Sequence, residues 1–203
     1  GIPTDEDFYF SIDCATSVAQ RGKIEAYERA GKKLPDGWVI SEKGVTMNDP
    51  KEVLAALTKG TAALTPLGGV GEETAGYKGY GYATAVEILS AALSNAKFMK
   101  DLNGLDPSGN KIPILLGHFF IAININNFIN PSIFKNIAGT ILRDLRESKK
   151  AEGAEKIYTA GEKEWIAWQF RKEHGCPVPP VLMAQLSDMN RKYELNYKFP
   201  WEK

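Results

Sequence analysis

The glycine-rich segment at residues 68–81, GGVGEETAGYKGYG, is where residue types and spacing most clearly suggest chemistry. It holds six glycines in fourteen residues and leads into an apolar run. Glycines let a backbone approach a ligand closely, and the amide groups at a helix start form a concavity for anions. Lys78, between Tyr77 and Gly79, adds a positive charge. The segment therefore predicts a site for a phosphate, a pyrophosphate or a carboxylate, or alternatively a tight linker whose lysine is only solvated.

This segment departs from the common nucleotide-binding patterns. Gly71 and Gly76 have the spacing of a P-loop, but Tyr77 comes before the lysine. Gly79 then stands where a Ser or Thr would bind magnesium. No G-x-G-x-x-G follows a strand, so the Rossmann fingerprint is absent as well.

Two acidic residues lie at the predicted starts of helices. Asp13 ends a predicted buried strand, and the junction of a strand with a helix is where α/β proteins bind ligands. The alternative is that Asp13, or a hydroxyl just after it, caps the helix. Glu162 follows Gly161 at another predicted helix start, where a carboxylate complements the helix dipole.

The histidines and cysteines predict no metal site and no nucleophile. His118 lies in an apolar run and is expected to be a packed core histidine, and His174 is expected to complement a helix C-terminus. Neither has a Cys or His at zinc-ligand spacing. Cys14 and Cys176 do not make a disulfide framework and fit a reducing, cytoplasmic compartment. Asp13 beside Cys14 disfavours a thiolate.

Composition excludes further classes of protein. The chain has 203 residues, with 25 basic and 25 acidic side chains, and a pI of about 6.9. A balanced chain does not bind nucleic acid or anionic membranes through bulk charge. No apolar run approaches the roughly 20 residues that a membrane helix needs.

Hydrophobic patterning predicts the elements that must position these groups. The predicted strands are residues 7–14, 112–125 and 156–159. The predicted helices are residues 16–30, 50–60, 82–99, 131–148, 162–174 and 181–193. The helix 82–99 is apolar on most sides, which is typical of a buried helix, and Asp49 is expected to cap the helix that Pro50 opens. Alternating strands and helices indicate an α/β or α+β class with a largely mixed sheet.

Several segments, in order, resemble the malate/L-lactate dehydrogenase family of the non-Rossmann type, with its sulfolactate, ureidoglycolate and diketogulonate dehydrogenase relatives. They run from about Asp7 to Pro180. The segments are DCATS at 13–17, GKI at 22–24, LPDGW at 34–38, LTPLGG at 64–69, GYKGYG at 76–81, GHFFIAI at 117–123 and YTAGE at 158–162.

The resemblance implies a fold, an activity and a set of contacts. The implied fold is a layered, mixed-sheet α/β structure of the sulfolactate dehydrogenase-like type, not a Rossmann fold. The implied activity is hydride transfer between a nicotinamide cofactor, NAD or NADP, and a 2-hydroxy or 2-oxo acid such as malate or lactate. Such enzymes form homodimers. The alternative is a non-catalytic module that binds anions or only dimerises.

Cofactor contacts carry over position by position. Asp13, Cys14 and Ala15 match the family's D-M-A turn, with Cys14 in place of the usual methionine. Tyr77 and Lys78 match its G-Y-K-G turn.

Gly161 and Glu162 match its P-G-E turn, with Ala160 in place of proline and a φ restraint lost. A carboxylate near a ribose repels a 2′-phosphate, so Glu162 favours NAD over NADP.

The resemblance also implies that part of the enzyme is missing. The family's proton-donating histidine and carboxylate-binding arginine lie upstream of the turn that contains Asp13, and His118 matches a different motif. Residues 1–203 thus resemble the C-terminal portion, with a cofactor-contacting core at 7–125, a helical part at 126–203 and no catalytic residue of its own. We expect this chain to need the N-terminal portion, since losing a placed acid costs roughly 100- to 10,000-fold in rate.

Overall fold

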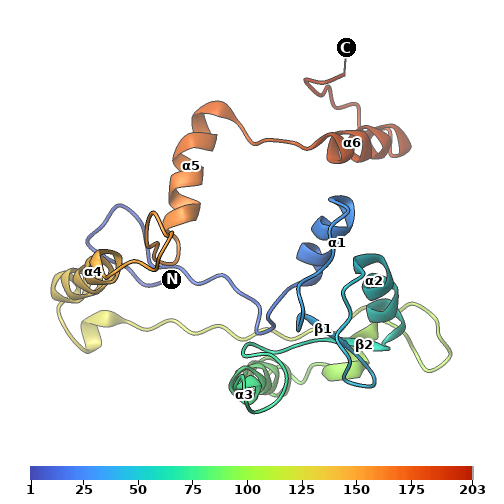
Figure 1. Cartoon of the computed structure of the whole chain (residues 1–203), viewed down its shortest axis with the longest axis horizontal. Helices are drawn as coiled ribbons and strands as arrows, with labels where there is room; N and C mark the ends of the chain where they lie inside the picture. The colour runs from blue at the N-terminus through green and yellow to red at the C-terminus, as the bar shows by residue number, and fades with distance from the viewer. Residues whose placement is uncertain (203) are drawn as a thin grey trace. The chain divides into compact units, whose positions relative to one another are not determined.

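The computed structural model describes residues 1–202, which divide into two compact units. One unit contains residues 13–123, and the other contains residues 1–12 together with the described residues from 124 on. Figure 1 shows the helices and the few short strands in chain order. None of the helices in the described residues is long and apolar enough to cross a membrane.

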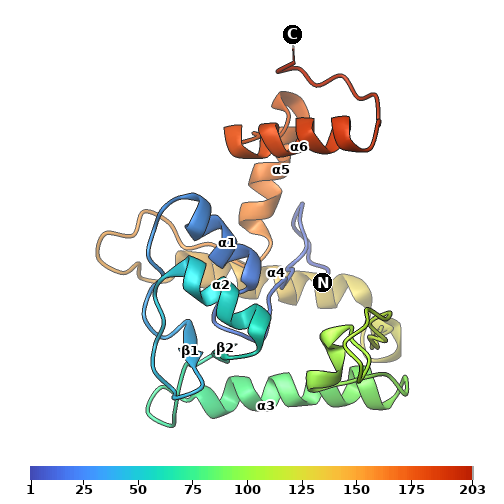
Figure 2. The same ribbon diagram turned by 90° about the vertical axis from the view of Figure 1, so that its right-hand side faces the viewer.

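The unit 13–123 has its core between two helices and a small sheet. Helix α1 (Arg21–Arg29) and helix α2 (Pro50–Lys59) lie side by side in Figures 1 and 2. Strands β1 (Val39–Ser41) and β2 (Ala62–Leu64) pair antiparallel, with Val39 opposite Leu64. The core consists of four buried side chains, Ile24, Leu34, Val39 and Val53.

Helix α2 follows the sequence prediction closely. The Asp49 carboxylate accepts hydrogen bonds from the backbone N–H groups of Lys51 and Glu52, at 2.9 and 3.0 Å. Pro50 occupies the first turn, and Gly60 ends the helix in the left-handed region. The expected cap and stop are therefore confirmed.

Helix α1 begins later than the sequence pattern predicts. The pattern predicts a helix from Thr16, but Thr16–Val18 are paired with the segment around Pro66 instead. The Val18 N–H donates to the Thr65 carbonyl at 2.9 Å, and the Leu67 N–H donates to the Thr16 carbonyl at 3.0 Å. These bonds keep residues 16–18 out of the helix, which begins only at Arg21.

The glycine-rich segment leads into helix α3 (Gly76–Glu87), which continues as the π-helical turn η1 (Ile88–Ala92). Helix therefore begins six residues before the predicted start at Tyr82 and ends before Met99. The prediction that this helix is buried is wrong for this chain. Ala91 is buried, but Val86, Ile88 and Leu93 are exposed.

The remainder of this unit is irregular. The 3₁₀ turn η2 (Met99–Asn103) precedes a loop, and the predicted strand 112–125 does not form. Leu116 makes one isolated bridge with Lys97, and residues beyond it have no ladder partner in the described chain. His118 is exposed, so the expectation of a core histidine is wrong as well.

The other unit is built on three helices. They are α4 (Pro131–Glu147), preceded by the 3₁₀ turn η3 (Ile125–Asn127), α5 (Glu162–His174) and α6 (Pro180–Lys192), each within a residue of its prediction. Pro131 follows the Asn130 cap of α4, whose side chain accepts from the Ser132 N–H at 2.9 Å.

The two strands predicted in this unit's sequence are absent among the described residues. Residues 7–14 do not form a buried strand, because only Phe10 pairs, with Ile2, while Tyr9 and Ile12 are exposed. Residues 156–159 have no strand partner, since Thr159 is held by Glu162 instead. The sheet of the described chain is thus the two-stranded β1–β2 pair, much smaller than the mixed sheet expected.

Candidate functional site

The first turn of α3 carries Tyr77 and Lys78 and is built by the glycines before it. The helix starts after Ala75, which has a positive φ of 60° and offers no side-chain cap. The Gly76 N–H donates to the Gly71 carbonyl at 3.1 Å, so the chain folds back on itself just before the helix. The exposed Lys78 thus lies inside the first turn of a helix that begins earlier than the sequence predicts, and the Gly76 and Lys78 N–H groups already donate to carbonyls of the preceding turn.

Gly79 allows this turn to approach the preceding loop. A Cβ at Gly79 would lie 2.2 Å from the Leu67 carbonyl oxygen, closer than any side chain tolerates. Leu67 in turn bonds to Thr16, directly after the predicted Asp13–Ala15 turn. The 65–67 loop therefore joins the two predicted site segments of the unit 13–123.

A hollow of about 500 Å³ lies beside this loop and the start of α3. Its lining includes Thr65, Pro66, Gly69, Gly71, Glu72, Gly76, Tyr77 and Tyr80. Tyr77 thus faces the hollow, whereas Lys78 and Asp13 are not part of its lining. Glu72 places a carboxylate in the same hollow, which opposes an anion there.

Lys78 is exposed and close to Tyr77. Its Nζ lies 5.9 Å from the centroid of the Tyr77 ring, and it forms no ion pair within residues 1–202. Asp13, Cys14 and Ala15 are exposed as well. A charge without an internal partner is available to a ligand, and here it is a cation next to backbone amides.

Gly161 and Glu162 lie in the other unit, at the start of α5. Gly161 has a φ of 93°, and a Cβ there would lie 2.7 Å from the Tyr9 carbonyl oxygen. The neighbouring Ala160 carbonyl accepts a hydrogen bond from the Ser11 N–H at 3.1 Å. The turn is therefore packed against the 9–11 segment and requires glycine.

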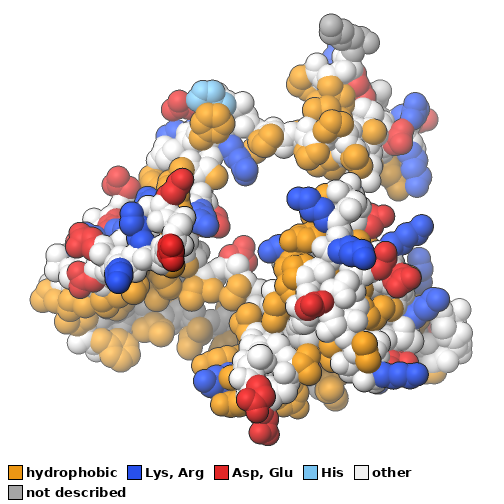
Figure 3. Space-filling model, viewed as in Figure 1, with side chains coloured by type: hydrophobic (Ala, Val, Ile, Leu, Met, Phe, Trp, Pro, Cys, Tyr) orange, Lys and Arg blue, Asp and Glu red, His pale blue; other side chains and the backbone are white. Residues whose placement is uncertain are grey.

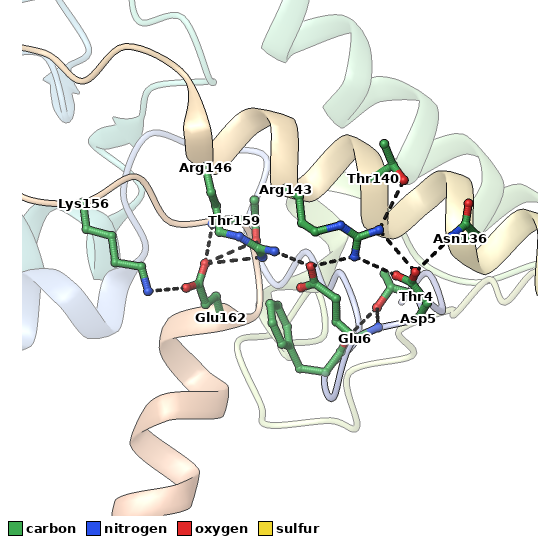
Figure 4. A network of polar contacts seen from close by, with 11 residues as sticks. Thr4, Asp5, Glu6, Asn136, Thr140, Arg143, Arg146, Lys156, Thr159 and Glu162 are labelled. Atoms are coloured by element: carbon green, nitrogen blue, oxygen red, sulfur yellow. Dashed lines mark hydrogen bonds and ion pairs between the residues drawn. The ribbon is translucent and has the colours of Figure 1, made fainter.

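The Glu162 carboxylate is buried, at 6% exposed, and turns into the protein (Figure 4). It accepts from the Thr159 N–H at 3.2 Å, and the Lys156 Nζ lies 2.6 Å away. Arg146 of α4 is 3.9 Å from the same carboxylate.

Arg146 and Arg143 extend this contact into a network with the N-terminal loop. Arg146 pairs with Glu6, and the Arg143 Nη1 contacts Asp5 at 3.0 Å and Glu6 at 3.3 Å. Two helices and the first residues of the chain are thus held together by alternating charges (Figure 4).

These charges shift the pKa values of the acids in a definite direction. Burial raises the pKa of Glu162, but the hydrogen bonds from Lys156 and Thr159 and the charges of Lys156 and Arg146 outweigh it, so the pKa is lowered. The hydrogen bond from Arg143 lowers the pKa of Asp5. Both carboxylates are therefore ionised at neutral pH.

This network was not predicted from the sequence. Arg143 and Arg146 are three residues apart on α4, a spacing that puts them on one helix face. Their partners come from residues 5–6, more than 130 positions away, and no local pattern predicts such a pairing.

The cysteines and His174 form no disulfide or metal site in residues 1–202. Cys14 and Cys176 are free and exposed, and His174 Nδ1 lies 2.9 Å from the Phe170 carbonyl on its own helix. No group of three or more potential metal ligands occurs in the part of the chain that the structure describes.

Comparison with known proteins identifies relatives along nearly the whole chain. The family model described as malate/L-lactate dehydrogenase matches residues 1–187. A malate dehydrogenase of Pyrococcus abyssi is 33% identical over 183 residues, which are 90% of this chain and 48% of that protein. The chain therefore spans about half the length of the curated relatives it matches.

Solved structures similar to this chain come from the same group of dehydrogenases and are likewise covered over about half of their length. The malate dehydrogenase from Entamoeba histolytica is 39% identical with a TM-score of 0.90, over 99% of this chain and 55% of that one. The sulfolactate dehydrogenase from Methanocaldococcus jannaschii is 30% identical with a TM-score of 0.69, over 96% of this chain and 51% of that one. The solved structures that this chain resembles include a sulfolactate dehydrogenase, as the sequence predicts, although the described chain has only a small sheet. The chain belongs to the malate/L-lactate dehydrogenase family.

Proposed function

We propose that this chain is the cofactor-contacting part of an NAD(P)-dependent oxidoreductase that transfers hydride between a nicotinamide and a 2-hydroxy or 2-oxo acid. One observation carries the proposal: the start of α3, with Lys78, packs through Gly79 on the same loop that pairs with the residues after Asp13. Relatives named malate, sulfolactate and ureidoglycolate dehydrogenases support the chemical class.

The residues present fit such a cofactor in their donor chemistry. The Lys78 ammonium would bind phosphate or pyrophosphate oxygens, and Asp13 would accept from a hydroxyl or an amide. The N–H groups of Gly76 and Lys78 already donate to the Gly71 and Ala75 carbonyls, so the charge is the main donor here. Cys14, Ala15 and Tyr77 would form walls of the cofactor groove, with Tyr77 offering a ring for stacking. When bound, the nicotinamide supplies the hydride acceptor or donor.

Gly161 and Glu162 take different roles in this proposal. Gly161 would offer its close-packed backbone to the cofactor. The Glu162 carboxylate already has Lys156, Thr159 and Arg146 as partners, so we propose that it positions this turn. Because the Glu162 carboxylate is paired inside the protein, it is not free to repel a 2′-phosphate, and the proposal takes in both NAD and NADP.

The substrate chemistry belongs to the rest of the enzyme in this proposal. Residues 7–125 would contain the cofactor-contacting core, and the family resemblance implies a homodimer. The acid donor and the carboxylate clamp would lie in the part of the relatives' length that this chain does not span. We therefore expect the chain alone to bind the cofactor without turning over malate or lactate.

Fluorescence titration of the chain with NADH tests the proposal. Lys78→Ala should raise the Kd about tenfold or more, since a charge-assisted hydrogen bond contributes about 1.5 to 3 kcal/mol. Lys43→Ala, another exposed lysine of the same unit, should leave the Kd unchanged.

Two other results would contradict it. Equal affinity for sulfate, ATP and NADH would indicate the non-catalytic anion-binding module instead. No thermal stabilisation by any of these ligands would indicate a module that only dimerises, because a ligand bound to the native state raises the melting temperature.

A further inference from the structure

Residues 117–123, which we call the bare segment, form an extended stretch without hydrogen-bond partners. Figure 1 draws it as a yellow extended tube. Among residues 1–202, no N–H or C=O of the bare segment makes a backbone hydrogen bond. It is anchored at Gly117, where a Cβ would lie 2.1 Å from the Ser90 carbonyl oxygen of η1. Every residue in it carries a free donor and a free acceptor, which is the condition of an unpaired strand.

The bare segment carries apolar side chains on both of its faces. Phe120 is 88% exposed, Ile121 is 74% exposed and Ile123 is 68% exposed. Neighbouring residues of an extended chain point to opposite sides, so Phe120 and Ile121 expose one apolar face each. Apolar residues on both faces are typical of a strand in the interior of a sheet that is covered on both sides.

The exposed area of the chain supports a large missing contact. The chain exposes 15939 Å² (Figure 3 shows one face of it). A compact protein of 22.4 kDa exposes about 9,400 Å², and two separate compact units of half that mass expose about 11,400 Å². The excess of several thousand Å² holds however the two units are placed. It is the size of a permanent interface between polypeptides.

The relatives indicate which polypeptide would cover this surface. The Entamoeba histolytica enzyme matches 99% of this chain with a TM-score of 0.90, yet the match covers 55% of its own length. The backbone of this chain therefore closely resembles part of an enzyme whose remaining polypeptide is nearly as long as this chain. We propose that the bare segment is the docking strand for the half of the family's length that this chain does not span. A strand of that half pairs with it, and apolar side chains of the same half cover Phe120 and Ile121.

Co-expression with a defined probe tests the proposal. The probe is the polypeptide of the Entamoeba histolytica malate dehydrogenase that lies outside the matched region, carrying an affinity tag. We expect it to capture the wild-type chain. Amide hydrogen exchange in residues 117–123 should then slow by about 100-fold or more, because those N–H groups gain partners.

Matched variants distinguish binding at this segment from non-specific apolar association. Ile121→Lys places a charge where the strand would be covered, and it should reduce capture by at least about tenfold. Val45→Lys makes the same change at an exposed turn residue of the same unit and should leave capture unchanged. Both side chains are exposed, so circular dichroism should show the wild-type fold for both variants.

Each other result overturns the proposal. No capture by the wild-type chain, equal capture by the two variants, or unchanged exchange in residues 117–123 would do so. Protection of these amides in the chain alone, with a dimer in sedimentation, would assign the surface to a second copy. No nicotinamide is present in these measurements, so their outcome is independent of the proposed cofactor site.

Discussion

Gly161 shows how a single missing side chain positions the start of a helix. Its φ of 93° and the nearby Tyr9 carbonyl exclude a Cβ for two separate reasons, backbone conformation and space. Gly153 has a φ of 77°, but a Cβ there would meet no other atom within 4 Å. At Gly153, therefore, only the backbone conformation disfavours a side chain. The two glycines thus allow the two costs to be measured separately.

We expect Gly153→Ala to destabilise the chain by about 1 kcal/mol, the cost of a left-handed non-glycine residue. Gly161→Ala should cost about 2 to 5 kcal/mol, because displacement of the 9–11 segment adds to it. Urea unfolding monitored by circular dichroism measures both variants. Equal losses would mean that the Tyr9 contact does not constrain the turn.

Glu162 makes the stability of its unit depend on pH. Its pKa is lowered below the ordinary value of 4.5 in the folded protein. The stabilisation is therefore complete above the unfolded pKa and is lost as pH falls through the folded pKa.

We expect Glu162→Gln to destabilise the chain by about 1 to 3 kcal/mol at pH 7, the value of a hydrogen bond to a charged group. The difference from wild type should shrink below about pH 4.5, as both side chains become neutral. Urea unfolding at a series of pH values tests this. Glu164→Gln, exposed on the same helix, should change stability by less than about 0.5 kcal/mol at any pH. A constant difference down to pH 2 would contradict the assignment.

At the scale of elements, α3 contains two glycines with opposite roles. Gly79 faces the Leu67 backbone at a distance that no Cβ tolerates, whereas Gly81 has open space around its missing side chain. Both lie inside the same helix, so helix propensity favours alanine equally at both positions.

Gly81→Ala should therefore stabilise the chain by about 0.5 to 1 kcal/mol. Gly79→Ala should destabilise it by about 1 to 3 kcal/mol, because the helix must move away from the 65–67 loop. Opposite shifts of the urea midpoint would confirm the close approach. A shift of the same sign in both variants would show that α3 does not pack on the loop as described.

At the scale of the whole molecule, the chain exposes more apolar surface than a compact protein does. Only eight apolar side chains, Pro50 among them, are buried in the described residues, while Phe120, Ile121 and many others are exposed. Surfaces of this extent mark interaction sites or aggregation hazards.

We expect the native chain to bind an apolar dye such as anilinonaphthalene sulfonate, with fluorescence several-fold above that of a compact protein of equal mass. Slow amide exchange at Val53 in the same sample would show that the core of the unit 13–123 is folded. Dye fluorescence no higher than that of the compact protein would contradict the exposure described.

Most of the helices and the family follow from local features of the sequence. Helices α2, α4, α5 and α6 were predictable because caps, prolines and periodic apolar residues act within a few positions. The ordered motifs from DCATS to YTAGE identified the family for the same reason, since each is a short run of adjacent residues.

Which segments find partners, by contrast, depends on the folded chain. A strand exists through its neighbours, and residues 112–125 have the composition of a strand but no ladder within the described chain. Likewise, the sequence predicts only that Glu162 complements the dipole at a helix start, whereas in the structure Arg146 and Lys156 make it the centre of an ion network. Pairing and burial depend on chain segments far apart in sequence, and these a local pattern does not specify.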